Sequence, residues 1–126
     1  MAKVLVVEDD PSYRSIIELK LQKEGFSVDT ASDGEEGLQK ALSTHPDIVL
    51  LDVFMPKIDG ASVLKALRED QWGKTAHVIV LTNINPENPI TQTIQSYHPS
   101  SYLMKANLDM DELVKKMHDM LLRTSQ

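Results

Sequence analysis

Three short runs of consecutive aliphatic residues most constrain how this chain can fold. They read VLVV at 4–7, IVLL at 48–51 and VIVL at 78–81, and polar residues interrupt none of them. A strand with one face in water alternates apolar and polar residues, whereas a parallel strand covered on both faces is apolar throughout. The runs therefore predict central strands of a parallel sheet that lies between two layers of helices.

Weaker strands and segments with helical spacing complete this alternation. Two further strands are expected at 26–30 and 102–104. Between the strands, apolar residues recur every three or four positions, as they do on the buried face of a helix. The expected helices begin at Pro11, follow a cap at Ser32 or Asp33, and cover 63–67, 90–96 and 113–121. Regular alternation of strand and helix predicts an α/β fold with helices on both faces of the sheet.

Composition and charge fit a single domain over residues 1–126 and disfavour several functions. The formal net charge is -6, and the basic residues are scattered, which disfavours direct binding of nucleic acid. Cysteine is absent, which excludes disulfides and thiolate metal sites. The start of the chain does not resemble a signal peptide, and no apolar stretch approaches the roughly 20 residues that span a bilayer. We expect a cytoplasmic protein without membrane contact.

Polar side chains follow the strands directly. They are Glu8, Asp9 and Asp10 after the first strand, Asp52 after the third, Thr82 after the fourth and Lys105 after the fifth. Parallel strands end at one edge of the sheet, where open α/β folds bind their ligands. Carboxylates select a hard cation such as Mg²⁺, and a hydroxyl and an ammonium are partners for phosphoryl oxygens. Because a carboxylate can also act as a nucleophile, the cluster predicts a phosphoryl acceptor site.

The sequence resembles the receiver domain of bacterial two-component response regulators, the family that includes the chemotaxis response regulator. The motifs that carry the resemblance are VLVVEDD, PDIVLLDVFMPKIDG, VIVLTN and SYLMK, and the match runs from Lys3 to about Leu122. It implies a doubly wound, flavodoxin-like (βα)5 fold with five parallel strands in the order 2-1-3-4-5. It also implies a signalling switch that catalyses only its own phosphorylation and dephosphorylation, and so is not an enzyme with an outside substrate.

The resemblance assigns roles around the acceptor. Asp52 would take the phosphoryl group from a sensor histidine kinase or a phosphotransfer protein. Asp9 and Asp52 would bind Mg²⁺, with Glu8 helping through a water and the backbone carbonyl of Phe54 completing the protein ligands. Asp10 matches no ligand position and is expected to cap the first helix or to contribute to the electrostatic field at the cluster.

The resemblance also assigns a switch. Lys105 would pair with the phosphoryl group, and Thr82 would move toward it. Tyr102 stands at the position of the switch aromatic and would turn inward when Thr82 moves. The surface between the fourth and fifth helices would then change and control a downstream partner protein or a second copy in a homodimer.

Three departures from the family pattern affect these expectations. Ala106 follows Lys105, where the family usually has a proline joined to the lysine by a cis peptide bond. Without proline, a cis Lys105–Ala106 bond would cost about 2.5–4 kcal/mol. A trans bond would leave open whether Lys105 reaches Asp52. The segment His98-Pro99-Ser100-Ser101 should alter the fourth helix. Phe54 and Asn83 are large for their positions and should restrict the path of a hydrolytic water, which would make the phosphorylated form long-lived.

Two other functions remain as alternatives. The chain could be an atypical receiver that acts as a phosphorylation-independent interaction module. It could also be a phosphatase of the halo-acid-dehalogenase type, which carries a D-x-D motif. Phe54 stands two positions after Asp52, where that motif has its second acid, and this disfavours the phosphatase function. The four histidines show no metal-ligand spacing, and Trp72 lies in a polar loop where nothing in the sequence supports a solvent-facing or partner-facing role.

Overall fold

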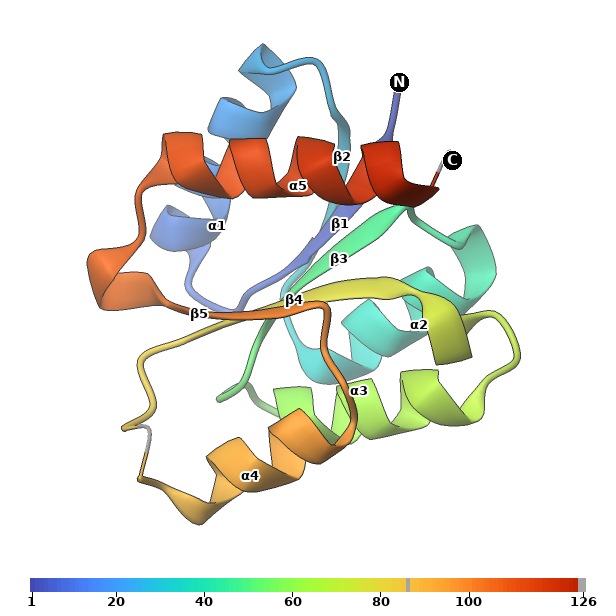
Figure 1. Cartoon of the computed structure of the whole chain (residues 1–126). Helices are drawn as coiled ribbons and strands as arrows, with labels where there is room; N and C mark the ends of the chain where they lie inside the picture. Colours follow the sequence, from blue (N-terminus) through green and yellow to red (C-terminus); the bar gives the residue numbers. More distant parts are fainter. Residues whose placement is uncertain (86, 125–126) are drawn as a thin grey trace.

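A five-stranded parallel sheet lies between two layers of helices in the computed structural model, which describes residues 1–85 and 87–124 (Figure 1). The strands are β1 (Lys3–Val7), β2 (Ser27–Ala31), β3 (Ile48–Asp52), β4 (His77–Thr82) and β5 (Ser101–Met104). Their order across the sheet is β2-β1-β3-β4-β5, with every neighbouring pair parallel. The predicted fold and strand order are confirmed.

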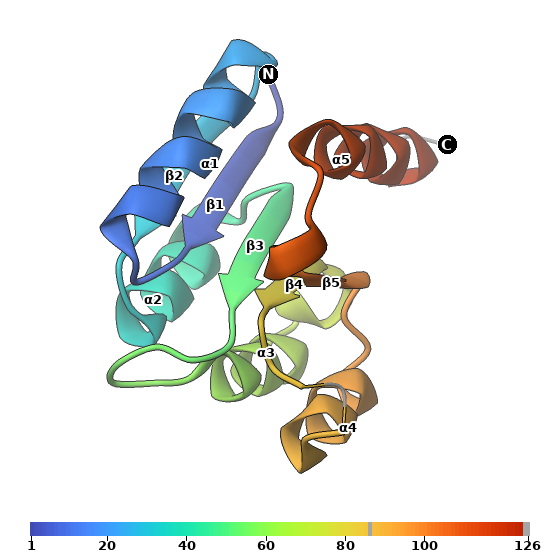
Figure 2. The same ribbon diagram turned by 90° about the vertical axis from the view of Figure 1, so that its left-hand side faces the viewer.

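The helices divide between the two faces of this sheet. They are α1 (Pro11–Lys23), α2 (Gly34–Thr44), α3 (Gly60–Glu69), α4 (Pro89–Ser96) and α5 (Met110–Thr124), with short 3-10 helices at Gly73–Thr75 and Lys105–Asn107. Figures 1 and 2 show α1 and α5 on one face and α2, α3 and α4 on the other. Within residues 1–85 and 87–124, no helix has the length and apolar character needed to cross a membrane.

Aspartates begin three of these helices. The carboxylate of Asp10 accepts hydrogen bonds from the first backbone amides of α1, and Asp33 and Asp59 do the same for α2 and α3. Such caps satisfy amide groups that have no partner inside the helix. The expected capping role of Asp10 is therefore confirmed, and Asp33 is the cap of the second helix.

Successive residues of each central strand pack into different cores. Val4 and Val6 of β1 lie in the core under α1 and α5, whereas Leu5 and Val7 lie in the core under α2, α3 and α4. All five residues of β3 are buried. Because both faces of these strands are covered, neither face tolerates polar residues, which explains the uninterrupted aliphatic runs.

The edge strand β2 begins one residue later than expected. Phe26 precedes it, and its side chain is buried in the core under α1 and α5, where its ring stacks on His118 with centroids 5.0 Å apart. The strand itself alternates between exposed and partly buried residues. Because β2 has a pairing partner on one side only, its apolar pattern is weaker and its bounds are harder to predict.

Trp72 packs against the protein itself. It is half-buried against the core under α2, α3 and α4. Its ring stacks on His45 just after α2, with centroids 4.6 Å apart and planes 11° from parallel. This stack joins the loops that precede β3 and β4.

The half-buried Arg68 of α3 fastens the segment before β4 to the turn before β5. Its guanidinium donates to four backbone carbonyls: Gly73 at 2.7 Å, Ala76 at 3.0 Å, Tyr97 at 2.9 Å and His98 at 2.9 Å. Burial lowers the pKa of Arg68. Hydrogen bonds that involve a charged group are the strong ones, so this clamp fixes the C-terminal end of α4.

Removing the guanidinium of Arg68 should destabilise the fold. Arg68→Met keeps an unbranched apolar side chain but leaves four carbonyls without their donor, and we expect the free energy of unfolding to fall by about 2–3 kcal/mol. Lys65→Met, an exposed position on the same helix, is the matched control for urea denaturation. Equal stabilities of the two variants would contradict a role for the clamp.

Candidate functional site

Three carboxylates meet at the carboxyl edge of the sheet. Glu8 and Asp9 follow β1, and Asp52 ends the neighbouring strand β3. Each offers one carboxylate oxygen, and these three atoms lie within 4.8 Å of one another. Glu8 is only 3% exposed and Asp52 only 8%, whereas Asp9 faces solvent. The strand ends therefore form one acidic cluster that is buried on one side and open on the other.

The ammonium of Lys105 lies inside this cluster. It contacts the carboxylate of Glu8 and lies 3.2 Å from Oδ1 of Asp52, with the side chain of Lys105 only 14% exposed. The structure contains no cis peptide bond among the described residues, so the Lys105–Ala106 bond is trans. The trans bond therefore leaves Lys105 within reach of Asp52.

The buried charges shift one another's pKa. Burial raises the pKa of Glu8 to about 7, although the hydrogen bond from Lys105 opposes the shift. Burial also raises the pKa of Asp52, against the attraction of Lys105. Burial disfavours the charged form of Lys105, but its contacts with Glu8 and Asp52 outweigh this effect and raise its pKa. Burial therefore disfavours the ionised carboxylates in the metal-free protein, and a bound cation would favour them.

Gly60 allows the chain to return close to the backbone of Asp52. Its amide donates to the carbonyl of Val53 at 2.7 Å. A Cβ at Gly60 would lie 2.1 Å from the carbonyl oxygen of Asp52. Only glycine fits at such a distance, so the start of α3 and the position of Asp52 depend on each other.

Thr82 and Tyr102 lie on the neighbouring strands. Thr82 ends β4, is buried, and accepts a hydrogen bond from the amide of Ile84 at 3.1 Å through its hydroxyl. Tyr102 lies on β5, packs against the core under α2, α3 and α4, and its hydroxyl is 3.5 Å from that of Thr91 on α4. Tyr102 thus connects β5 with α4, and its switching role stays a prediction.

Phe54 and Asn83 are placed very differently. Phe54 lies in the loop after β3 with 59% of its surface exposed, and its backbone carbonyl as a cation ligand stays a prediction. The side-chain carbonyl of Asn83, just after β4, accepts a hydrogen bond from the amide of Ala106 at 3.0 Å. Asn83 therefore anchors the backbone directly after Lys105.

Comparison with known proteins shows to which family this chain belongs. The family model described as the response regulator receiver domain matches residues 4–118 of this chain. The chain belongs to this family. The resemblance seen in the sequence motifs is confirmed.

Curated relatives agree with this assignment. Response regulator ArlR of Staphylococcus saprophyticus is 34% identical over 126 residues, which are the whole of this chain and 55% of that protein. The DNA-binding dual master transcriptional regulator RpaA of Synechocystis is 30% identical over 128 residues, 52% of its length. The receiver domain described here spans about half the length of these relatives.

Solved structures are similar over nearly the whole chain. Chemotaxis protein CheY4 of Vibrio cholerae is 32% identical with a TM-score of 0.84, covering 95% of this chain and 98% of that one. Response regulator TrrA of Thermotoga maritima, solved in complex with Mg(2+)-BeF, is 34% identical with a TM-score of 0.81 and covers 95% and 99%.

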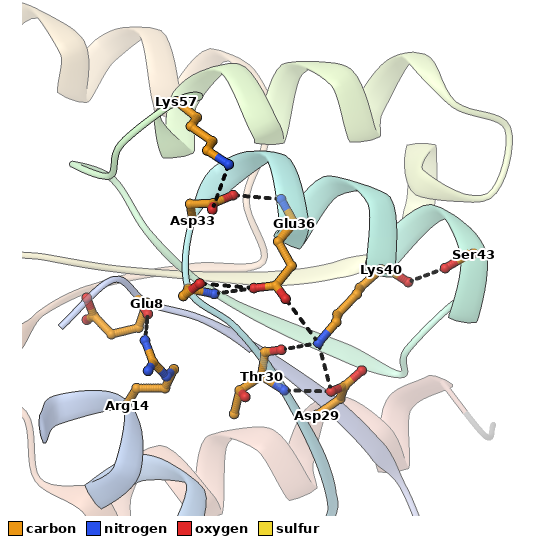
Figure 3. A network of polar contacts seen from close by, with 10 residues as sticks. Glu8, Arg14, Asp29, Thr30, Asp33, Glu36, Lys40, Ser43 and Lys57 are labelled. Atoms are coloured by element: carbon orange, nitrogen blue, oxygen red, sulfur yellow. Dashed lines mark hydrogen bonds and ion pairs between the residues drawn. The ribbon is translucent and has the colours of Figure 1, made fainter. Parts of the chain in front are cut away.

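Two residues of α1 that approach the cluster were not predicted from the sequence. The guanidinium of Arg14 donates to the backbone carbonyl of Glu8 at 2.9 Å (Figure 3). The ring of Tyr13 lies beside the ammonium of Lys105. Their position in the first turn after the Asp10 cap was the available signal, because that turn starts at the edge where β1 ends.

A polar network braces the loop between Asp52 and Gly60 (Figure 3). Lys57 in this loop has its ammonium 3.7 Å from the carboxylate of Asp33, which caps α2. Glu36 of α2 in turn accepts a hydrogen bond from the amide of Ser32 at 2.6 Å. The first contact connects the loop after β3 to the start of α2, and the second holds α2 to the residue that follows β2.

The metal-free protein should lose stability as the pH rises from about 4.5 to 7. Because the pKa of Glu8 is raised from 4.5 to about 7 on folding, the folded state holds a proton in this window that the unfolded state has released. We expect the free energy of unfolding to fall by about 2 kcal/mol between pH 5 and pH 8.

Urea denaturation in the presence of a chelator at the two pH values measures this change. Glu8→Gln should remove most of the pH dependence, whereas Glu69→Gln, an exposed position at the end of α3, should retain it. Stability that stays level or increases with pH in the wild type would show that Glu8 is ionised throughout.

Proposed function

We propose that this receiver domain is a phosphorylation-activated signalling switch that accepts a phosphoryl group on Asp52. The observation that carries the proposal is the ammonium of Lys105, 3.2 Å from Asp52 within a cluster of three carboxylates. A nucleophilic carboxylate, acidic cation ligands and a fixed ammonium are the groups that phosphoryl transfer to a carboxylate requires. Membership of the receiver family supports the same assignment.

The donor set fits Mg²⁺. Glu8, Asp9 and Asp52 supply oxygen ligands only, with one oxygen of each within 4.8 Å of the others, and a hard cation prefers such ligands. We assign these carboxylates to the ion, Glu8 through a water, and the carbonyl of Phe54 as a further ligand. When bound, the ion would neutralise charge on the transferring group. The relative TrrA was solved with Mg(2+)-BeF.

Asp52 acts as the nucleophile in the proposed transfer. One of its carboxylate oxygens attacks the phosphorus of a phosphohistidine on a sensor histidine kinase or a phosphotransfer protein. The P–N bond breaks, its electron pair stays on the imidazole nitrogen, and an acyl phosphate forms on Asp52. Lys105 pairs with a phosphoryl oxygen and loses part of its contact with Glu8.

Thr82 and Tyr102 convert this event into a change of surface. The hydroxyl of Thr82 exchanges its contact with the amide of Ile84 for one with the phosphoryl group. Tyr102 turns into the space that Thr82 vacates and gives up its contact with Thr91. Because that contact connects β5 to α4, the surface formed by α4, β5 and α5 changes its shape and presents itself differently to a partner.

We place the switch in the cytoplasm, between a sensor kinase and a downstream protein. The partner that reads the changed surface is a protein target or a second copy of this chain. The name of the relative RpaA describes it as DNA-binding, but the net charge of -6 and the scattered basic residues of this chain argue that its own partners are proteins.

Asp52 should be the only site of phosphorylation. Incubation with Mg²⁺ and acetyl phosphate should add one phosphoryl group to the wild type and none to Asp52→Asn, as measured by intact mass. Asp119→Asn, an exposed position on α5, serves as the matched control and should react like the wild type. An unmodified wild type would favour a phosphorylation-independent interaction module, and steady phosphate release from assorted monoesters would favour a phosphatase.

The phosphorylated form should be long-lived because the bulky side chain of Phe54 restricts the path of a hydrolytic water. Phe54→Asn places an amide at this position and should shorten the lifetime several-fold. The loss of the phosphoryl group after removal of acetyl phosphate measures this effect by intact mass. Leu122→Asn changes another exposed apolar residue, on α5, and should have no effect. Rapid loss in the wild type that Phe54→Asn leaves unchanged would refute this account.

A further inference from the structure

The ring of Tyr13 forms a third contact for Lys105. The ammonium lies 4.7 Å from the centre of this ring, in addition to its contacts with Glu8 and Asp52. Tyr13 is half-buried at the start of α1, and the carboxylate of Asp10 accepts a hydrogen bond from its amide at 3.4 Å. The cap that starts α1 thus also places the ring.

The ring differs from the two carboxylates in one important respect. A cation bound by Glu8 and Asp52 would draw their negative charge away from Lys105 and would repel its ammonium. The face of a tyrosine ring attracts an ammonium through its quadrupole, whether or not the carboxylates are occupied. Burial also raises the pKa of Tyr13, so its hydroxyl stays protonated and offers no carboxylate-like charge to a metal ion.

The backbone that carries Lys105 is fixed separately. The amide of Ala106 donates to the side chain of Asn83 at 3.0 Å, and this bond holds the start of the Lys105 side chain. The ring of Tyr13 then limits where the flexible end of that side chain can go. Asn83 comes from the end of β4 and Tyr13 from α1, so Lys105 is held from both sides of the cluster.

We propose that Tyr13 is a positioning residue for phosphoryl transfer to Asp52, because its ring keeps the ammonium of Lys105 beside Asp52 when the carboxylates bind a metal ion. The proposal rests on the function proposed above and adds a residue to its site. Tyr13 touches Lys105 and acts through it, so its contribution requires that lysine.

The contact can be tested without metal or phosphoryl donor. A ring 4.7 Å from the ammonium should displace the proton resonances of the terminal methylene of Lys105, which are identified by their loss in Lys105→Arg. In metal-free protein, Tyr13→Phe should keep this displacement and Tyr13→Leu should abolish it. Tyr97→Leu makes the same change at a half-buried tyrosine near the opposite edge and should have no effect.

The consequence for transfer is measured with the same variants. At saturating Mg²⁺ and acetyl phosphate, Tyr13→Leu should lower the maximal rate of Asp52 phosphorylation by about three- to tenfold, whereas Tyr13→Phe and Tyr97→Leu should match the wild type. In a Lys105→Met background, Tyr13→Leu should change the rate little. A purely structural role for Tyr13 would instead give the same loss with or without the lysine.

Each outcome decides the proposal. Loss of the resonance displacement together with a lysine-dependent fall in the rate supports it. An unchanged resonance, an unchanged rate or a loss that persists in Lys105→Met overturns the positioning role while the phosphorylation of the wild type stands. A wild type that takes up no phosphoryl group refutes the proposed function, and the positioning role is then refuted with it.

Discussion

Two buried carboxylates of like charge at one edge of the sheet constrain the whole site. Glu8 and Asp52 repel each other in an environment that disfavours either charge, and the ammonium of Lys105 balances them. Such an arrangement persists only if every backbone segment that carries a charge is held in place. The close approach of Gly60 to Asp52 and the bond from Ala106 to Asn83 serve that purpose.

The helix α4 is held in the fold by different means at its two ends. Tyr102 of β5 contacts Thr91 near the start of the helix, and Thr82 ends the strand β4 that precedes this helix in the chain. At the other end, Arg68 ties the carbonyls of Tyr97 and His98 to α3 and its loop. A helix that is fixed at one end can respond to the acidic cluster at the other without losing its place in the fold.

The fold and the acidic cluster were predictable because they follow from burial and topology. Aliphatic runs identify strands covered on both faces, and parallel strands bring Glu8, Asp52 and Lys105 to one edge wherever they lie in the sequence. The role of Asn83 was not predictable in this way, because its hydrogen bond to Ala106 depends on the local path of two loops. The packing of Trp72 was not predictable for a related reason, since a polar loop gives no sign of a stacking partner such as His45.

The position of Trp72, stacked on His45, determines which part of the protein its fluorescence can report on. Trp72 is the only tryptophan in the chain, and it precedes β4, whereas Asp52 lies where the neighbouring strand ends. The length of β4, about 20 Å at 3.3 Å for each residue, separates the two ends of the sheet. The indole is therefore placed to follow the integrity of the fold, far from the chemistry at the opposite edge.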